Sequence, residues 1–79
     1  MKKIKIALVG YGVVGSGVVQ LLQENRELFI NQTGFEYSIK TIIDKDPSQL
    51  KKVVGIQTSS DYKQALNDPE IDIVVELTG

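Results

Sequence analysis

The sequence predicts an α/β fold in which helices flank a parallel sheet. Short apolar runs alternate with stretches whose apolar residues recur every three or four positions. The first apolar run ends directly in a glycine-rich turn. Strands and helices that alternate in this way are typical of parallel sheets, whose strands are covered on both faces and are therefore apolar on both sides.

The first expected strand covers residues 4–9, and the periodicity changes after the glycines that follow it. From Val14 to Phe29 apolar side chains return at helical spacing, and polar side chains fill the positions between them. This pattern predicts a single amphipathic helix of about four turns. Asn31 and Gly34 supply its expected end.

The second expected strand covers residues 37–43. Asp46 then stands before Pro47, which suits the first position of a helix, and Gln49 occupies the third position of a capping box. We therefore expect a short helix that Asp46 caps and that ends near Val53.

The last part of the chain predicts one more strand–helix–strand unit. Residues 56–58 form a brief strand, and Ser60 is expected to cap a helix over residues 61–67. Asp68-Pro69 ends that helix, and residues 71–77 form the last strand.

Composition narrows the possible functions. The chain has 79 residues, a net charge of −1, and neither cysteine nor histidine. These absences remove disulfides, thiolate catalysis, most zinc sites and the commonest general base. The spacing of Glu70, Asp72 and Glu76 does not indicate a metal site either, so we expect no catalytic and no metal-ligating residue here. The balanced charge gives no field that would attract nucleic acid.

Residues 10–15 match the pattern G-x-G-x-x-G between an expected strand and an expected helix. The first glycine makes a tight turn, the second leaves room for a pyrophosphate beside the backbone, and the third lets helix and strand pack closely. Free N–H groups at the start of the helix would then bind the phosphates. The sequence therefore predicts a Rossmann-type nucleotide-binding fold whose pyrophosphate site comprises Gly10, Tyr11, Gly12, Val13, Val14 and Gly15.

The amino terminus also has the outline of a secretion signal, because Lys2, Lys3 and Lys5 precede an uncharged run. The glycine turn explains the spacing of the glycines within that run better than a signal does. We therefore expect a cytoplasmic protein that has no membrane partner.

Asp44 ends the second expected strand, where an acidic residue commonly binds the adenosine ribose. It lies 29 residues after Gly15, more than the usual ~20, because the helix and the loop around Gly34 are long. Asp46 competes for this role but is better explained as a helix cap. Lys45 would instead bind the 2′-phosphate of NADP, so NAD and NADP both fit, with a slight preference for NAD.

Thr78 and Gly79 follow the last strand, at the strand ends where such sheets bind ligands, and are expected to border the nicotinamide. Gly17 is an additional glycine in the first turn of the long helix, and we expect it to pack closely against a neighbouring element. The side chains of Tyr37 and Tyr62 are interpreted as packing residues.

Three segments resemble homoserine dehydrogenases. Residues 5–19, KIALVGYGVVGSGVV, are similar to the strand, G-x-G-x-V-G turn and helix start with which that family begins. Residues 68–79, DPEIDIVVELTG, resemble the family's D-P-E-I-D-V-V-V-E-x-x-G segment. Residues 42–46 fall where the family has an apolar pair, a small or apolar residue, a basic residue and Asp.

This resemblance implies NAD(P)-dependent interconversion of aspartate 4-semialdehyde and homoserine, in threonine and methionine biosynthesis, by a homo-oligomer. It places Lys45 at the family's basic position near the ribose. Asp44 departs from the apolar residue that is commoner there, which leaves the cofactor preference open. The family's catalytic lysine, acidic residues and alkali-metal site would lie beyond residue 79.

Two other interpretations remain open. A dihydrodipicolinate reductase or a Gfo/Idh/MocA-type sugar dehydrogenase would carry the same glycine turn, although residues 68–79 favour the first family. A non-enzymatic nucleotide-sensing module would carry it too. If the protein is a homoserine dehydrogenase or one of these other oxidoreductases, residues 1–79 are the first half of a nucleotide-binding domain. We expect this segment alone to be inactive and prone to self-association, because its last strand has an unpaired edge.

Overall fold

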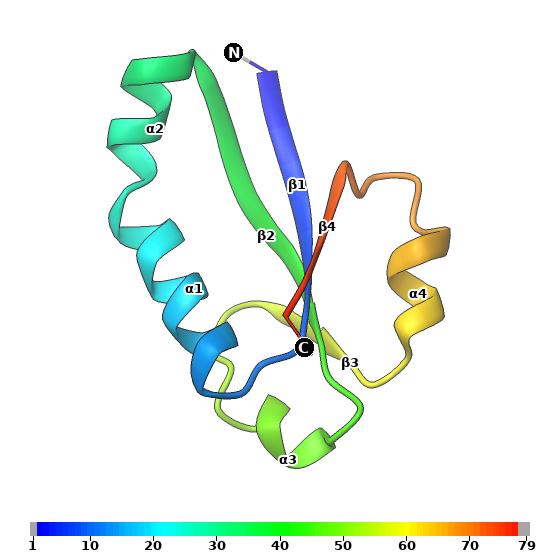
Figure 1. Ribbon diagram of the computed structural model, residues 1–79. Coiled ribbons are helices and arrows are strands. Elements are labelled where there is room, and N and C mark those ends of the chain that lie inside the picture. The colour runs from blue at the N-terminus through cyan, green and yellow to red at the C-terminus, as the bar shows by residue number, and fades with distance from the viewer. Residues whose placement is uncertain (1, 78–79) are drawn as a thin grey trace.

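In the computed structural model, which describes residues 2–77, parallel strands form one sheet with helices on both faces (Figure 1). The strands are β1 (Lys2–Val9), β2 (Phe35–Ile43), β3 (Gln57–Ser59) and β4 (Ile73–Glu76), in the spatial order β3-β2-β1-β4. The helices are α1 (Val13–Glu24), α2 (Arg26–Thr33), α3 (Pro47–Leu50) and α4 (Tyr62–Asn67). The predicted α/β arrangement is therefore confirmed.

The chain reverses direction across the sheet between β3 and β4. It moves from β1 outward through β2 to β3, and then crosses back to place β4 on the other side of β1. Helices α1 and α2 cover one face, and α4 covers the other (Figure 1). Such a change of direction is the switch point at which open α/β sheets bind their ligands.

Each face of the sheet has its own apolar core. Leu8 and Ile42 pack with Val19 of α1 on one face. Ile43 packs with Ala65 of α4 on the other face, together with Ala7 and Val9 of β1. Successive residues of a strand point to opposite faces, so burying both faces requires the unbroken apolar runs seen in the sequence.

The predicted single helix between Val14 and Phe29 is wrong in one respect, because the structure divides it at Asn25. The backbone N–H and the side-chain Nδ2 of Asn25 both donate to the carbonyl of Leu21, at 3.1 and 2.8 Å. A side chain that competes for a helical carbonyl weakens the regular ladder. Helix α2 then ends at Gly34, as expected, with φ of 76°.

The expected helix after β2 is present but shorter than predicted. Asp46 caps α3 as expected, since its carboxylate accepts a hydrogen bond from the Ser48 amide. The helix ends at Leu50 instead of Val53, whose amide makes only a turn bond to the Leu50 carbonyl. Four residues allow a single helical turn.

Ser60 does not cap the last helix, which corrects the sequence-based expectation. Asp61 is the cap of α4, and its carboxylate accepts a hydrogen bond from the Lys63 amide at 2.9 Å. Asp is at least as good a cap as Ser, so the neighbouring carboxylate takes the position. Strand β4 spans Ile73–Glu76, which is shorter than the predicted residues 71–77.

Strand β2 contains one more residue than the strand it pairs with. Ile6 of β1 lies opposite Ile39, whereas the next residue, Ala7, lies opposite Thr41. Lys40 is therefore the extra residue of a β-bulge. Its ammonium contacts the carboxylates of Asp68 at 2.5 Å and Glu70 at 2.6 Å, both in the connection between α4 and β4.

Tyr37 is a packing residue, as expected. Its side chain is buried, its hydroxyl donates to the Leu22 carbonyl, and its ring meets Phe29 edge-on at 4.8 Å between centroids. Within residues 2–77, no helix has both the length and the apolar content that a membrane crossing would require.

Candidate functional site

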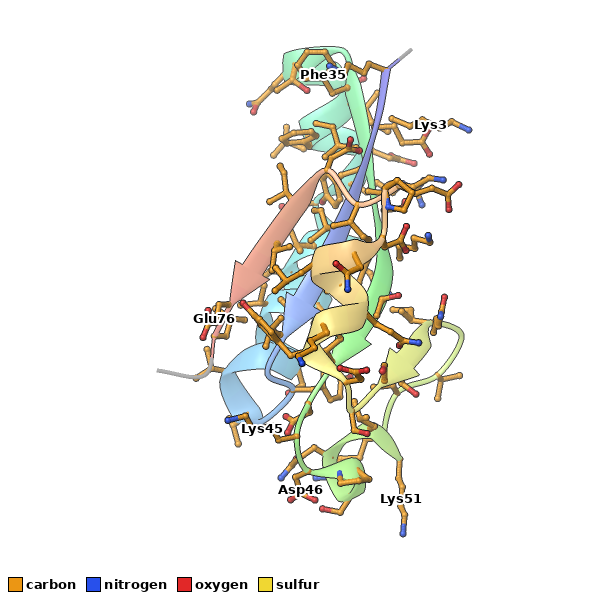
Figure 2. The ribbon with its side chains drawn as sticks, turned by 90° about the vertical axis from the view of Figure 1, so that its right-hand side faces the viewer. Lys3, Phe35, Lys45, Asp46, Lys51 and Glu76 are labelled. Carbon is orange, nitrogen blue, oxygen red and sulfur yellow. The ribbon has the colours of Figure 1, made fainter. Side chains whose placement is uncertain are left out.

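The candidate site lies at the carboxyl ends of β1 and β2, where the glycine turn meets the residues that follow Ile43. Lys45 and Asp46 occupy this end of the sheet, opposite the end that carries Lys3 and Phe35 (Figure 2). Because the strands are parallel, the loops that follow them gather at one edge.

Gly10 and Gly15 shape the turn as the sequence predicted. Gly10 has φ of 99°, a backbone conformation that other residues rarely adopt, and its amide donates to the Ile43 carbonyl at 2.7 Å. A Cβ on Gly15 would lie 2.1 Å from the Gly10 carbonyl oxygen. Only glycine therefore allows α1 to begin so close to the end of β1.

Gly12 leaves open space above the start of α1. A Cβ at this position would meet no atom within 4 Å, and Gly12 caps α1 without any side-chain hydrogen bond. The first intrahelical bond runs from the Ser16 amide to the Gly12 carbonyl at 2.9 Å. The amides of Val13, Val14 and Gly15 precede that bond, so they are donors without a helical partner, and the partial positive charge of the helix start is accessible.

Asp44 connects the glycine turn to α3. One carboxylate oxygen accepts a hydrogen bond from the Tyr11 amide at 2.8 Å, and the other accepts from the Asp46 amide at 2.9 Å. The sequence placed Asp44 at the end of β2 but gave no sign of these two contacts. In the predicted capping box, Gln49 would have bonded the Asp46 amide, and Asp44 makes that bond instead.

Asp46 is occupied by its own helix. The Ser48 hydroxyl donates to it at 2.7 Å and the Ser48 amide at 3.0 Å. These two hydrogen bonds, the hydroxyl first, hold the pKa of Asp46 below its ordinary value. The side chain is therefore a helix cap, as the sequence indicated.

Two expectations about neighbouring positions have different outcomes. Gly17 does not pack closely against another element, because a Cβ there would meet nothing within 4 Å in the described part of the chain. That expectation is wrong, since Gly17 lies on the open side of α1. Thr78 and Gly79, expected beside the nicotinamide, lie outside the described residues.

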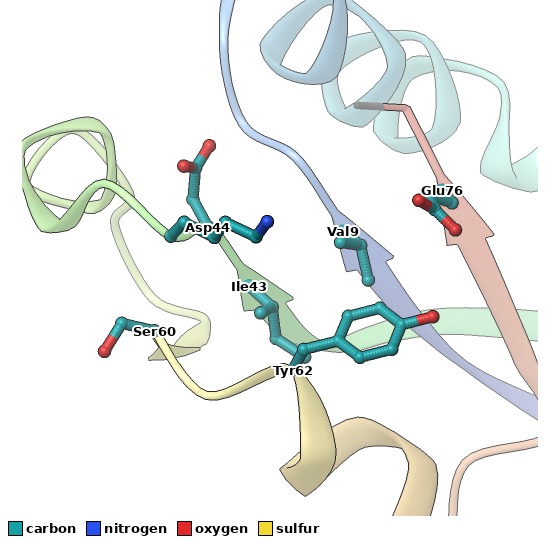
Figure 3. A pocket seen from close by; sticks show the side chains of 7 residues that line it. Val9, Ile43, Asp44, Ser60, Tyr62 and Glu76 are labelled. Carbon is teal, nitrogen blue, oxygen red and sulfur yellow. The ribbon is translucent and has the colours of Figure 1, made fainter. Parts of the chain in front are cut away.

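A cavity of about 440 Å³ opens beside Asp44 on the α4 side of the sheet (Figure 3). Tyr62, which the sequence indicated as a packing residue, lies at the start of α4, lines this cavity and is 37% exposed. The lining residues are Val9, Ile43, Asp44, Lys45, Ser60, Tyr62 and Glu76. The sequence carried no signal that Ser60, Tyr62 and Glu76 would share a cavity.

Together, a parallel sheet with a switch point, a glycine turn of this geometry and exposed helix amides define the class of dinucleotide-binding α/β domains. Residues 10–79 match the family model described as "Homoserine dehydrogenase, NAD binding domain". The chain belongs to this family.

Relatives of known name agree with this assignment. Over 99% of its length the chain is 42% identical to a homoserine dehydrogenase of Helicobacter pylori, and over its whole length it is 34% identical to one of Bacillus subtilis. It spans 18% and 19% of those two proteins.

Solved structures show the same likeness. The homoserine dehydrogenase of S. aureus, at pH 6.5, superimposes with a TM-score of 0.87 and 40% identity, and that of Thiobacillus denitrificans with 0.90 and 32%. Both comparisons cover the whole chain, and they cover 20% and 19% of the solved chains.

Proposed function

We propose that this chain binds the pyrophosphate and adenosine part of NAD or NADP, in a protein that interconverts aspartate 4-semialdehyde and homoserine. The open space above Gly12, beside the close approach of Gly15 to Gly10, carries the proposal. The bound nicotinamide would supply the hydride transfer. The chain spans only 18% and 19% of the two curated relatives named above, so the small-molecule substrate is proposed for the whole protein and not assigned to residues of this chain.

The proposed phosphate site uses the backbone and not charged side chains. Amides of the turn and the first turn of α1 would donate to the phosphate oxygens, and the helix dipole would favour their negative charge. The residues of this site are Gly10, Tyr11, Gly12, Val13, Val14 and Gly15. Because the Tyr11 amide already donates to Asp44, the amides that follow it are the better candidates as phosphate donors.

Asp44 is proposed as the ribose ligand as well as the residue that holds the turn. A carboxylate has about four lone-pair positions, and the amides of Tyr11 and Asp46 occupy one on each oxygen. The remaining lone pairs are available to the ribose hydroxyls. Lys45 borders the same cavity and would favour a 2′-phosphate, so we propose only a modest preference for NAD. Thr78 and Gly79 are proposed at the nicotinamide side.

The test is the affinity of the natural protein for NAD after substitution of Gly12. Gly12→Ala and Gly12→Val should fold as the parent does, because the position is open, and should lose affinity progressively as the side chain fills the phosphate site. We expect the loss in Gly12→Val to reach at least about tenfold, since one charge-assisted hydrogen bond already contributes that much.

Gly17→Ala is the matched control, because it adds the same methyl group to an equally open position on the same helix. It should leave the affinity for NAD unchanged. If Gly12→Val binds NAD as tightly as the parent protein, the proposed phosphate site is wrong. Reduction of aspartate 4-semialdehyde with NADH or NADPH tests the activity separately, and a nucleotide-sensing protein would bind NAD without showing it.

A further inference from the structure

Between β1 and α1 the chain has two glycines and a single residue with a side chain, Tyr11, and we propose that this side chain positions the turn for phosphate binding. The inference rests on the proposed function, because it requires a pyrophosphate bound at the start of α1. Tyr11 is then a positioning residue, whose ring acts on the ligand only through the backbone of Gly10 and Gly12.

The two glycines give the turn its shape but cannot hold it. Gly10 has φ of 99°, and Gly12 has φ of −77° and ψ of −155°. Glycine has access to many backbone conformations and loses more conformational freedom on ordering than any other residue. It also has no side chain that could pack. A turn with glycine on both sides of one residue therefore depends on that residue for its anchoring.

Hydrogen bonds from the turn reach the end of β2. The Gly10 amide donates to the Ile43 carbonyl at 2.7 Å, and the Tyr11 amide donates to the Asp44 carboxylate at 2.8 Å. Two consecutive residues of the turn are thus bonded to two consecutive residues of the neighbouring segment. Both amides have acceptors within the protein, so they fix the course of the turn and leave phosphate binding to the amides that follow.

The side chain of Tyr11 provides the second anchor. It is partly buried and packs against the core cluster that Leu8, Val19 and Ile42 form. These three residues belong to β1, α1 and β2, the elements that meet at the turn. Tyr11 is therefore held by its backbone and by its ring. The donor amides at the start of α1 keep their positions before a ligand arrives, so less order has to be gained on binding.

The experiment measures equilibrium binding of NAD, ADP and adenosine to the natural protein, by calorimetry. ADP carries a pyrophosphate, whereas adenosine has the same base and ribose without phosphate. Tyr11→Ala removes the ring, and Tyr11→Phe keeps the ring without its hydroxyl. Phe35→Ala is the matched control, because it removes an aromatic ring that is 41% exposed at the opposite end of the sheet (Figure 2).

We expect Tyr11→Ala to weaken the binding of NAD and of ADP about tenfold, which corresponds to the cost of ordering the backbone of one residue. Binding of adenosine should not change. Tyr11→Phe and Phe35→Ala should match the parent. The inference is overturned if Tyr11→Ala binds ADP normally, if it loses adenosine to the same extent as ADP, or if Tyr11→Phe loses as much as Tyr11→Ala.

Hydrogen exchange at single amides of the parent protein, without ligand, is a second test that needs no variant. The amides of Gly10 and Tyr11 should already exchange slowly, because both donate within the protein. If they exchange freely and become protected only when NAD is added, the turn is not held in advance and the inference is overturned. A parent protein that binds neither NAD nor ADP would instead overturn the proposed function.

Discussion

Two regions of the sheet carry carboxylates but use them differently: the carboxyl ends of β1 and β2, and a charged cluster of Lys5, Lys40, Asp68 and Glu70. At the carboxyl edge, Asp44 accepts hydrogen bonds from the backbone amides of Tyr11 and Asp46. At the amino end of β4, beside the middle of β1 and β2, Asp68 and Glu70 form ion pairs with the ammonium of Lys40, and Glu70 also meets Lys5 at 3.5 Å. Asp44 thus bonds to backbone amides, whereas Asp68 and Glu70 bond to lysine side chains.

This difference supports the proposal that the ligand binds at the carboxyl ends of the strands and not at the charged cluster. In the group of Lys5, Lys40, Asp68 and Glu70, the charges are two positive and two negative, so the group neutralises itself. At the carboxyl edge the neutral amides of Tyr11 and Asp46 contact Asp44, while the amides at the start of α1 stay available as donors. A cluster of charged residues is thus weaker evidence for a site than a set of donors without partners.

The largest expected effect is a loss of stability on substitution of Gly15, at the start of α1. Gly15→Ala places a Cβ 2.1 Å from the Gly10 carbonyl oxygen, so the start of α1 must move away from β1. We expect the free energy of unfolding to fall by about 3 kcal/mol, as for an overpacked core. Urea denaturation of the natural protein measures this change.

Gly17→Ala on the same helix should have the opposite sign. Its methyl group meets open space, and alanine in a helix interior is more stable than glycine by about 1 kcal/mol. Equal effects of the two substitutions would show that the close approach of Gly15 to Gly10 does not constrain the fold.

A second prediction sharpens the roles of the two neighbouring charges at this edge. Asp44→Ala should lower kcat/KM for NADH by about tenfold or more, because it removes the proposed carboxylate hydrogen bond to the ribose as well as the bond from the Tyr11 amide. Lys45→Ala should reduce the use of NADPH and spare NADH. Steady-state kinetics of the natural protein with both cofactors measures the changes. A strong NADPH preference that disappears in Lys45→Ala would show that Lys45, and not Asp44, governs cofactor choice.

The smallest expected effect concerns the stability that the charged cluster around Lys40 contributes, and its dependence on pH. The hydrogen bonds from Lys40 are the largest cause that lowers the pKa of Asp68 and of Glu70, and their carboxylates, Asp68 first, raise the pKa of Lys40. The carboxylates therefore contribute stability above their ordinary pKa values, near 4, and this contribution is lost as the pH falls through their lowered values. The contribution of Lys40 is present below its ordinary value and is lost as the pH rises through the raised one.

Lys40→Met should accordingly lower the melting temperature slightly at pH 7, and the difference from the parent should shrink as the pH falls through the lowered pKa values of the two carboxylates. Lys3→Met, an exposed lysine on β1, is the control and should show no such pH dependence. The affinity for NAD at pH 7 should not change in either variant. A loss of NAD binding in Lys40→Met would mean that the charged cluster around Lys40 affects the proposed NAD site.

The sequence was sufficient for the order of elements and for the glycine turn, because both depend on local patterns. Periodicity predicted the strands and helices, and the backbone demands of Gly10 and Gly15 followed from the motif. The break at Asn25 was missed, because a side chain that bonds a helical carbonyl leaves the apolar period unchanged. Ser60 was chosen over Asp61 because both are good caps and only the course of the chain decides between them.

Contacts between distant segments were beyond the reach of the sequence. Asp44 meets Tyr11 across 33 positions, and no spacing rule connects a carboxylate to one particular amide of the turn. Tyr62 and Glu76 border one cavity only because α4 and β4 return to the end of β2. The sequence predicted the cofactor class through the motif and the family resemblance, whereas the walls of the cavity required the folded chain.

The bulge at Lys40 changes which residues of β2 face each side of the sheet. Before it, Tyr37 and Ile39 point to the α1 side of the sheet, and after it the odd-numbered residue Ile43 points to α4. A strand of uniform alternation would keep Ile43 on the side of its odd-numbered predecessors and would exchange the places of Ile42 and Ile43. Because of this one inserted residue, Ile42 packs against α1 and Ile43 packs against α4. The bulge at Lys40 therefore also determines which face of the sheet Asp44 points to, although Asp44 lies four residues further along the chain.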